Sequence, residues 1–282
     1  MKKLFWMILF SASTLLGQEP ISFLLGQELL DENSAEMAAI EFRRYALETE
    51  PATAQAQAYL HAAHAYLQAG QSNDAEAMLQ QAEQRIHAHP ALPVLHAEAA
   101  VLQNDLQTAL YFLDAIPIQT NSTLAAFAAR RSAELLLRSG KTVDAQDRLA
   151  RSPFDEAQSL LALDAYAFAP KKSPAVGGWL GLIPGAGYWY SGEIANGFRS
   201  LLLNSLFIFG MAQTAQDDQW GAFAVISFFE LTWYSGSIYG GVDAAHRYNR
   251  NQLEKCVDQL NVPQVESDPD VMVPLFQLKV LF

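Results

Sequence analysis

The amino-acid sequence predicts an all-α protein, built from an array of helix-turn-helix repeats followed by an apolar helical hairpin. Between residues 24 and 168, small and large apolar residues recur at helical spacing in similar blocks. Residues 176–250 are apolar and rich in glycine and aromatic residues, and they contain two stretches long enough for long helices. The 282 residues are 51% hydrophobic, which excludes a disordered chain.

The charge of the chain is unevenly distributed. Residues 18–169 carry 20 acidic and 9 basic side chains, whereas residues 170–250 carry five of each. This change in composition predicts a linker at residues 169–175, where Pro170 and Pro174 interrupt any helix. A net charge of −12 without a basic tract argues against a nucleic-acid-binding protein.

The N-terminus has the pattern of a secretory signal peptide over residues 1–17. Lys2 and Lys3 precede an apolar stretch from Leu4 to Leu16, and small residues lie near Gly17. The stretch is short for a membrane span, which needs about 20 residues. We therefore expect an exported protein with periplasmic repeats, the alternative being a retained anchor helix.

The repeats share a frame of alanines that is easy to follow along the chain. Ala38, Ala75, Ala109 and Ala145 are separated by 37, 34 and 36 residues, and each follows a glycine or asparagine by five positions. Gly70 and Gly140 are predicted to end a helix with positive φ, and Asn104 to do so less well.

This frame resembles the tetratricopeptide repeat, a helix pair of about 34 residues. The best copy reads Tyr59-x-x-Ala62-Ala63-x-x-Tyr66-x-x-x-Gly70. The resemblance implies stacked helix pairs at residues 24–168 that present a concave surface to a protein or peptide. An alanine-rich helical bundle is the alternative fold for this region.

A groove on this array would be acidic on average, so a basic segment is the expected partner. The groove is assigned to aromatic, histidine and arginine side chains along the predicted first helices of the pairs. The candidate residues are Tyr59, His61, Tyr66, His96 and Arg130.

Two apolar stretches form the predicted hairpin. Phe198 to Ala215 and Trp220 to Val242 are long enough to span a bilayer, and Gln216 to Gln219 forms a polar turn between them. With an exported N-terminus, the basic residues flanking the hairpin lie outside, against the positive-inside tendency. The alternatives are a hairpin in the outer membrane or one leaflet, and a buried soluble core.

The glycine-rich segment before the first stretch reads Pro184-Gly185-x-Gly187-x-x-Tyr190-x-Gly192. It resembles the turn of small two-helix membrane hairpins of bacteria, and the stretch from Glu230 to Asn249 is similar to the end of hairpins attached to repeat arrays in envelope proteins. These families have no agreed enzymatic activity, and some are associated with the insertion of inner-membrane proteins. The candidate structural or functional residues of the hairpin are Pro184, Gly185, Gly187, Tyr190, Gly192, Arg199, Asn204, Glu230, Trp233, Tyr234, Gly236, Tyr239 and Gly240.

Two features of the hairpin lead to specific expectations. Glu230 is the only charged residue of its stretch, so we expect it to pair with Arg199 or to meet Asn204 across the hairpin. Gly236 and Gly240 have the small-xxx-small spacing that allows helices to approach closely.

No motif for catalysis or for a cofactor is present in the sequence. His61 and His64 lie on one helix face but lack a third ligand nearby, and the single cysteine, Cys256, has no histidine partner. Residues 251–282 read as an acidic linker and an apolar tail. We therefore expect a non-enzymatic, membrane-associated envelope adaptor without metal or cofactor that contacts protein and membrane lipid; the alternative is a factor assisting membrane-protein insertion or transport.

Overall fold

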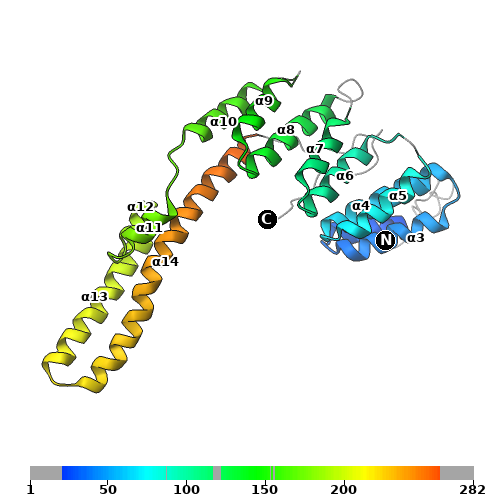
Figure 1. The fold of residues 1–282 in the computed structure, drawn as a ribbon. Coiled ribbons are helices and arrows are strands. Elements are labelled where there is room, and N and C mark those ends of the chain that lie inside the picture. The colour runs from blue at the N-terminus through cyan, green and yellow to red at the C-terminus, as the bar shows by residue number, and fades with distance from the viewer. Residues whose placement is uncertain (1–20, 87, 117–121, 153, 155, 261–282) are drawn as a thin grey trace, which may run out of the picture. The chain divides into compact units, whose positions relative to one another are not determined.

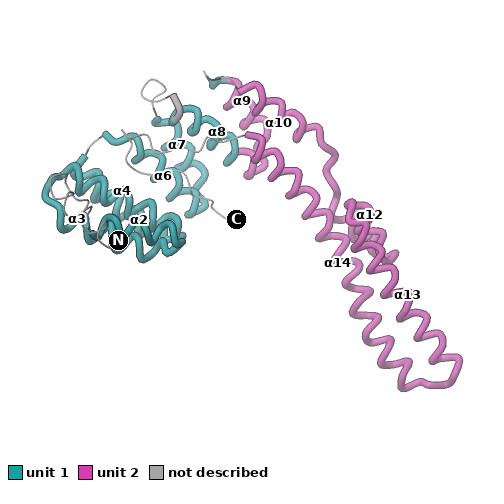
Figure 2. The backbone as a smooth tube through the Cα atoms, turned by 180° about the vertical axis from the view of Figure 1, so that it is seen from behind, with its two compact units in different colours: residues 1–135, 151–154, 262–282 teal, residues 136–150, 155–261 magenta. Residues whose placement is uncertain are grey.

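The chain is all-α, as the sequence predicts, since every regular element in the described residues is a helix (Figure 1). The computed structural model describes residues 21–86, 88–116, 122–152, 154 and 156–260. The predicted signal peptide and residues 261–282 of the predicted tail lie outside the described residues. The chain divides into two compact units (Figure 2).

Unit 1 is a succession of helices, and from α2 to α7 each packs against its neighbour in sequence. Its helices are α2 (Ile21–Asp31), α3 (Ala35–Glu48), α4 (Ala52–Gln68), α5 (Ser72–Glu83), α6 (Ala91–Leu102), α7 (Leu106–Asp114) and most of α8 (Ser122–Arg138). α4 also contacts α6. The core consists largely of alanine and leucine, and α4 and α6 are buried along almost their whole length.

The same turn joins successive helices at Asn33, Gly70, Asn104 and Gly140, which all have positive φ. After each of them, the next amide donates a hydrogen bond of 2.8–2.9 Å to the carbonyl oxygen five positions earlier. This is the Schellman ending of a helix. The predicted turn positions are confirmed, and the alanine that follows each turn by five residues is completely buried.

Unit 2 contains the longest helices. Its elements are the end of α8, α9 (Thr142–Ala150), α10 (Ala157–Phe168), α11 (Pro174–Leu180), α12 (Ala186–Tyr190), α13 (Ile194–Gln216) and α14 (Trp220–Gln259). α13 and α14 pack side by side and are joined by a short turn in which Asp218 has positive φ (Figure 1). α11 and α12 pack on α14, and α10 packs on it as well.

The structure differs from the sequence expectation at the end of the apolar region. α14 continues to Gln259, so residues 251–259 are helical rather than part of a linker. This part of the helix is held against α10, because the Ser159 hydroxyl donates to the Leu260 carbonyl oxygen at 3.3 Å and the Cys256 thiol is buried beside Ala162. Arg138 and Glu254 add a bidentate ion pair with distances of 2.8 and 3.0 Å.

The boundary between the compact units also differs from the expected one. It falls within α8, after Leu135, although residues 169–173 are indeed without helix. The reason is that the last turns of α14 return to α10 and complete its packing, which ties the segments on both sides of residues 169–173 into one unit.

Candidate functional site

The α13–α14 pair, residues 194–259, exposes a large apolar surface. Between Ser200 and Gln216, α13 has no charged residue. The exposed apolar side chains are Ile194, Phe198, Leu201, Leu202, Leu206, Ile208 and Phe209 on α13, and Trp220, Val225, Phe228, Phe229, Leu231, Trp233 and Tyr239 on α14. A contiguous exposed apolar surface of this kind is typical of a site that contacts another protein or a membrane.

The residues that the two helices bury are small or polar. Some of them face other helices, since Gly241 lies against Gly177 of α11 and Cys256 lies beside Ala162 of α10. On α13 the buried residues are Gly197 and Asn204, and the Ser200 hydroxyl donates to the Ser237 hydroxyl of α14 at 3.1 Å. The buried residues of α14 are Glu230, Ser237, Gly241, Ala244, Ala245 and Cys256. The pair is thus small and polar inside and apolar outside, which is the reverse of a soluble helix pair.

Three glycines allow the backbones of α11, α12 and α14 to lie in direct contact. A side chain at Gly177 would meet the carbonyl oxygen of Gly241, and a side chain at Gly187 would meet both Gly177 and Gly241. The predicted close contact through Gly236 is wrong, since nothing lies within 4 Å of where its side chain would be. The residues of α14 that make the close contact with α11 and α12 are instead Ser237, Gly241 and Ala245. Ser237 and Gly241 lie one residue further along the helix than the expected pair.

The glycine motif at residues 184–192 supplies two tight turns. Gly185 has a φ of +89°, its amide donates to the Ser237 hydroxyl at 3.4 Å, and a side chain there would meet the Gly197 carbonyl. Gly192 has a φ of +83° and ends α12 with the same Schellman turn as the repeats. The Tyr190 hydroxyl accepts a hydrogen bond of 3.0 Å from the Ser173 amide. Pro184, partly exposed, enters the first turn.

A set of polar contacts closes the base of the pair, the end at which α12 meets α13. Arg247 holds Glu193 in a bidentate pair with distances of 2.8 and 2.9 Å and also contacts Asp243. The hydrogen bonds from Arg247 lower the pKa of Glu193 below its usual value, more than burial raises it. Lys172 lies over the rings of Tyr190 and Tyr248, at 4.6 and 5.5 Å from their centroids.

Neither of the predicted partners of Glu230 forms a hydrogen bond with it. Both carboxylate oxygens of Glu230 are buried without a hydrogen-bond partner, and so is the side-chain oxygen of Asn204. Arg199 turns to Asn196 at 3.3 Å instead, and the Asn204 amide donates to the Ser200 carbonyl at 2.7 Å.

The remaining candidates of the pair lie toward its surface. Trp233 and Tyr239 are exposed, and Gly240 lies against the Tyr188 ring. The Tyr234 hydroxyl donates to the Leu182 carbonyl oxygen at 2.8 Å, which ties the glycine-rich segment to α14.

In unit 1, four of the five residues assigned to a binding groove are buried. Tyr59, His61, Tyr66 and His96 lie in the helical core, and only Arg130 is partly exposed. Their position follows from the near-complete burial of α4 and α6 by the helices on both sides. A partner therefore cannot touch these four side chains in this structure.

His96 and His64 show two opposite environments within that core. His96 stacks on Phe112, and its ring nitrogens lie 3.2 Å from Glu76 and 3.1 Å from Glu83. Burial alone lowers the pKa of His96, but the two carboxylates outweigh burial and raise it. His64 has no such carboxylates, so burial, followed by repulsion from His61, lowers its pKa to about 3.

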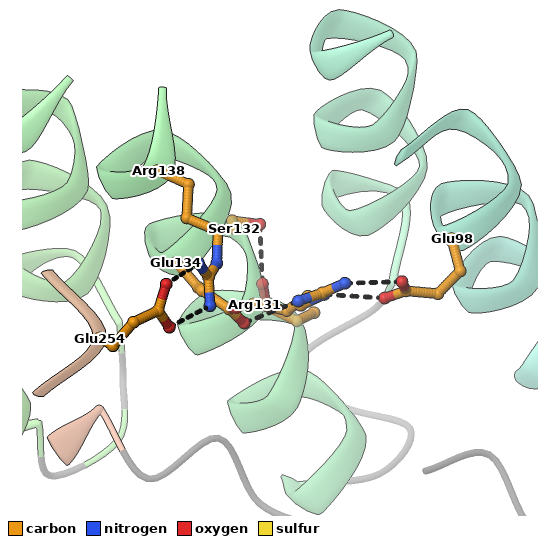
Figure 3. Close-up of polar contacts among 7 residues, drawn as sticks. Glu98, Arg131, Ser132, Glu134, Arg138 and Glu254 are labelled. Carbon is orange, nitrogen blue, oxygen red and sulfur yellow. Dashed lines mark hydrogen bonds and ion pairs between the residues drawn. The ribbon is translucent and has the colours of Figure 1, made fainter. Parts of the chain in front are cut away.

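A buried ion cluster at Arg131, next to Arg130, is not predicted from the sequence. Arg131 donates two hydrogen bonds, of 2.8 and 2.7 Å, to Glu98 of α6 and one of 2.7 Å to Glu134 on its own helix (Figure 3). The spacing of Arg131 and Glu134 by three residues was a visible signal, whereas the pairing with Glu98 is long-range. The cluster ties α8 to α6.

The possible metal ligands of the described residues are not clustered. No group of three His, Cys, Asp or Glu side chains in that part of the chain can hold a metal ion.

Of the described helices, α13 is the one that is long and apolar enough to cross a membrane by length and composition. Comparison of the chain with protein-family models, with curated proteins and with solved structures gives no match.

Proposed function

We propose that the protein is a non-enzymatic membrane adaptor of the cell envelope, anchored by the α13–α14 pair and holding a protein partner on its helical repeats. The observation that carries the proposal is the exposed apolar surface of the pair. A bilayer is the environment that removes such a surface from water on all sides at once.

Both helices of the pair belong in the bilayer. The 23 residues of α13 give a length of about 34 Å at about 1.5 Å per residue, which matches a hydrocarbon core of about 30 Å. α14 packs along α13, so it occupies the same layer even though Glu230 and several glycines lower its hydropathy. The unpartnered Glu230 faces the helix contact rather than the outer surface, as intramembrane acids do.

The helices of unit 1 support a tetratricopeptide-like array as the partner-binding part. Unit 1 has three equal turns, each followed by a buried alanine at the same place, which is what stacked helix pairs require, and the fourth copy at Gly140 and Ala145 belongs to unit 2. Because the expected groove residues are buried, the partner would contact exposed acidic side chains such as Asp31, Glu36 and Asp74. A basic peptide remains the expected partner, on grounds of charge.

The membrane assignment is tested by co-flotation of the full chain with phospholipid vesicles, comparing two matched substitutions. Leu202 on α13 is 71% exposed and Leu161 on α10 is 69% exposed. Leu202→Lys places a charge in the bilayer and should reduce flotation, whereas Leu161→Lys should float as the unmodified chain does. Equal flotation of the two variants would contradict the proposal.

A second candidate function is assistance in the insertion of membrane proteins, with the pair itself as the working part. The buried and unpartnered Glu230 favours it, because an unpaired carboxyl in an apolar helix pair is costly and is rarely retained without a role. Glu230→Gln keeps the shape and should then abolish function in cells while membrane binding persists. Full function of this variant would exclude the second candidate.

A further inference from the structure

The glycine-rich segment, residues 174–190, runs into the apolar layer and back out along α14. Its descending half contacts α14 at successively deeper levels. Gly177 lies at Gly241, Gly181 lies at Ser237 and Ile238, and Leu182 receives the hydrogen bond from Tyr234.

The returning half of the segment climbs along the same part of α14. Gly185 lies at Ser237, Gly187 lies at Gly241, and Tyr190 shares Lys172 with Tyr248 near the base. The segment therefore forms a re-entrant helix-turn-helix whose tip is level with Tyr234. Beyond that level, α13 and α14 are the only described helices that continue toward the turn at Asp218 (Figure 1).

The tip of the segment lies near the middle of the apolar layer. From Asp243 to Trp220, α14 rises about 34 Å at about 1.5 Å per residue, and from Asp243 to Tyr234 it rises about 13 Å. Half of a hydrocarbon core is about 15 Å. If the pair spans the bilayer, the segment fills one leaflet only.

The outward side of the segment is apolar and exposed. Trp179 is 75% exposed and Ile183 is 63% exposed, and Val176 and Leu182 are exposed as well. This face continues the apolar surface of the α13–α14 pair at the same depth, so acyl chains of that leaflet are the occupant that fits it.

From this asymmetry we infer that the protein prefers convexly curved membranes, with its base on the convex side. This inference rests on the proposed membrane function. Among the described helices, four segments (α11, α12, α13 and α14) occupy the leaflet at the base, whereas two occupy the opposite leaflet. A convex outer leaflet offers more area per lipid and accommodates the wider end, as it does for shallow amphipathic helices.

The test is competition of the full chain between small sonicated and large extruded vesicles of one phosphatidylcholine–phosphatidylglycerol mixture, labelled with different dyes and separated after binding. We expect a several-fold preference for the small vesicles per unit of lipid. Trp179→Ala/Ile183→Ala trims the segment and should reduce this preference.

The matched control is Leu206→Ala/Phe209→Ala, which trims side chains of 63% and 66% exposure in the opposite leaflet. This variant should keep or increase the preference for small vesicles. Equal binding of the unmodified chain to both sizes, or an equal loss of preference in both variants, would overturn the inference while leaving membrane anchoring intact. No binding to either size would instead contradict the proposed function. Crosslinking of two copies through Trp179→Cys would assign the face to a second copy and also overturn the inference.

Discussion

The side chain of Asn249 bonds both backbone groups of Lys172. Its amide nitrogen donates to the Lys172 carbonyl oxygen at 2.7 Å, and its oxygen accepts from the Lys172 amide at 2.9 Å. These two bonds fasten residues 169–173, which precede the glycine-rich segment, to α14. Asn249 therefore holds the base of the α13–α14 pair closed.

Asn249→Ala should loosen residues 169–173. Loss of the amide leaves two partly buried backbone groups unsatisfied, at a cost of about 1–3 kcal/mol. Tryptic cleavage after Lys171 and Lys172 should become faster than in the unmodified chain. The matched control is Asn251→Ala at an exposed position of the same helix, which should leave the rate unchanged. Equal rates for both variants would show that the two bonds do not fasten the base.

Glycines five residues apart on α14 should respond in opposite ways to alanine. Gly241→Ala would push a methyl group into the Gly177 carbonyl and should destabilise unit 2 by about 1–3 kcal/mol or more. Gly236→Ala meets open space and should be neutral or stabilising by up to about 1 kcal/mol, because alanine is the better helix former. Thermal unfolding in detergent measures both effects. A larger loss of stability in Gly236→Ala than in Gly241→Ala would mean that Gly236 makes the close contact expected from the sequence.

Arg131→Met should be among the most destabilising substitutions in unit 1. It leaves the Glu98 carboxylate buried without the guanidinium that neutralises it, which costs about 3–5 kcal/mol. Arg43→Met, at an exposed position of α3, should change stability by less than about 0.5 kcal/mol. Addition of Glu98→Gln to Arg131→Met should recover part of the loss in urea unfolding, and an additive further loss would contradict the interpretation.

The two buried histidines give the stability of unit 1 opposing dependences on pH. The folded-state pKa of His64 is about 3, so unfolding takes up a proton as the pH falls below about 6.5, and stability decreases toward pH 3. The pKa of His96 is raised, so its contribution is fully present below about 6.5 and is lost as the pH rises through the folded-state value.

His64→Leu should therefore reduce the loss of stability in acid, and His96→Gln should reduce the loss of stability as the pH rises above about 6.5. Urea unfolding as a function of pH measures both changes, and His246→Leu on the exposed side of α14 serves as the control. Identical pH profiles of His64→Leu and the unmodified chain would show that His64 is not the acid-sensitive group.

Local patterns predicted the helical fold well, because the signals that set it are short-range. Gly70 and Gly140 were assigned positive φ from their place after a helical run, and the turn chemistry requires nothing distant. The buried alanines followed from the same frame. Helix ends were less predictable, since α14 extends to Gln259 through contacts of Cys256 and Leu260 with α10 that no local pattern announces.

The arrangement of side chains was harder to predict from the sequence. Tyr59 and His96 were expected in a groove, but a helix flanked on both sides loses its exposed face, which depends on the packing of neighbours. Gly236 and Gly240 match a contact spacing as well as Ser237 and Gly241 do, but of the first two only Gly240 has a close neighbour, the Tyr188 ring, and the spacing does not distinguish it from Gly236. The Arg131–Glu98 pair joins residues 33 positions apart, which spacing alone cannot assign.

The most direct test of membrane anchoring by the α13–α14 pair is alkaline carbonate extraction of membranes from cells that express the full chain. Retention in the membrane pellet is the predicted result, with release of the Leu202→Lys variant into the supernatant and retention of Leu161→Lys. Complete release of the unmodified chain would contradict anchoring and would mean that the apolar surface of α13 and α14 is covered by protein instead of lipid.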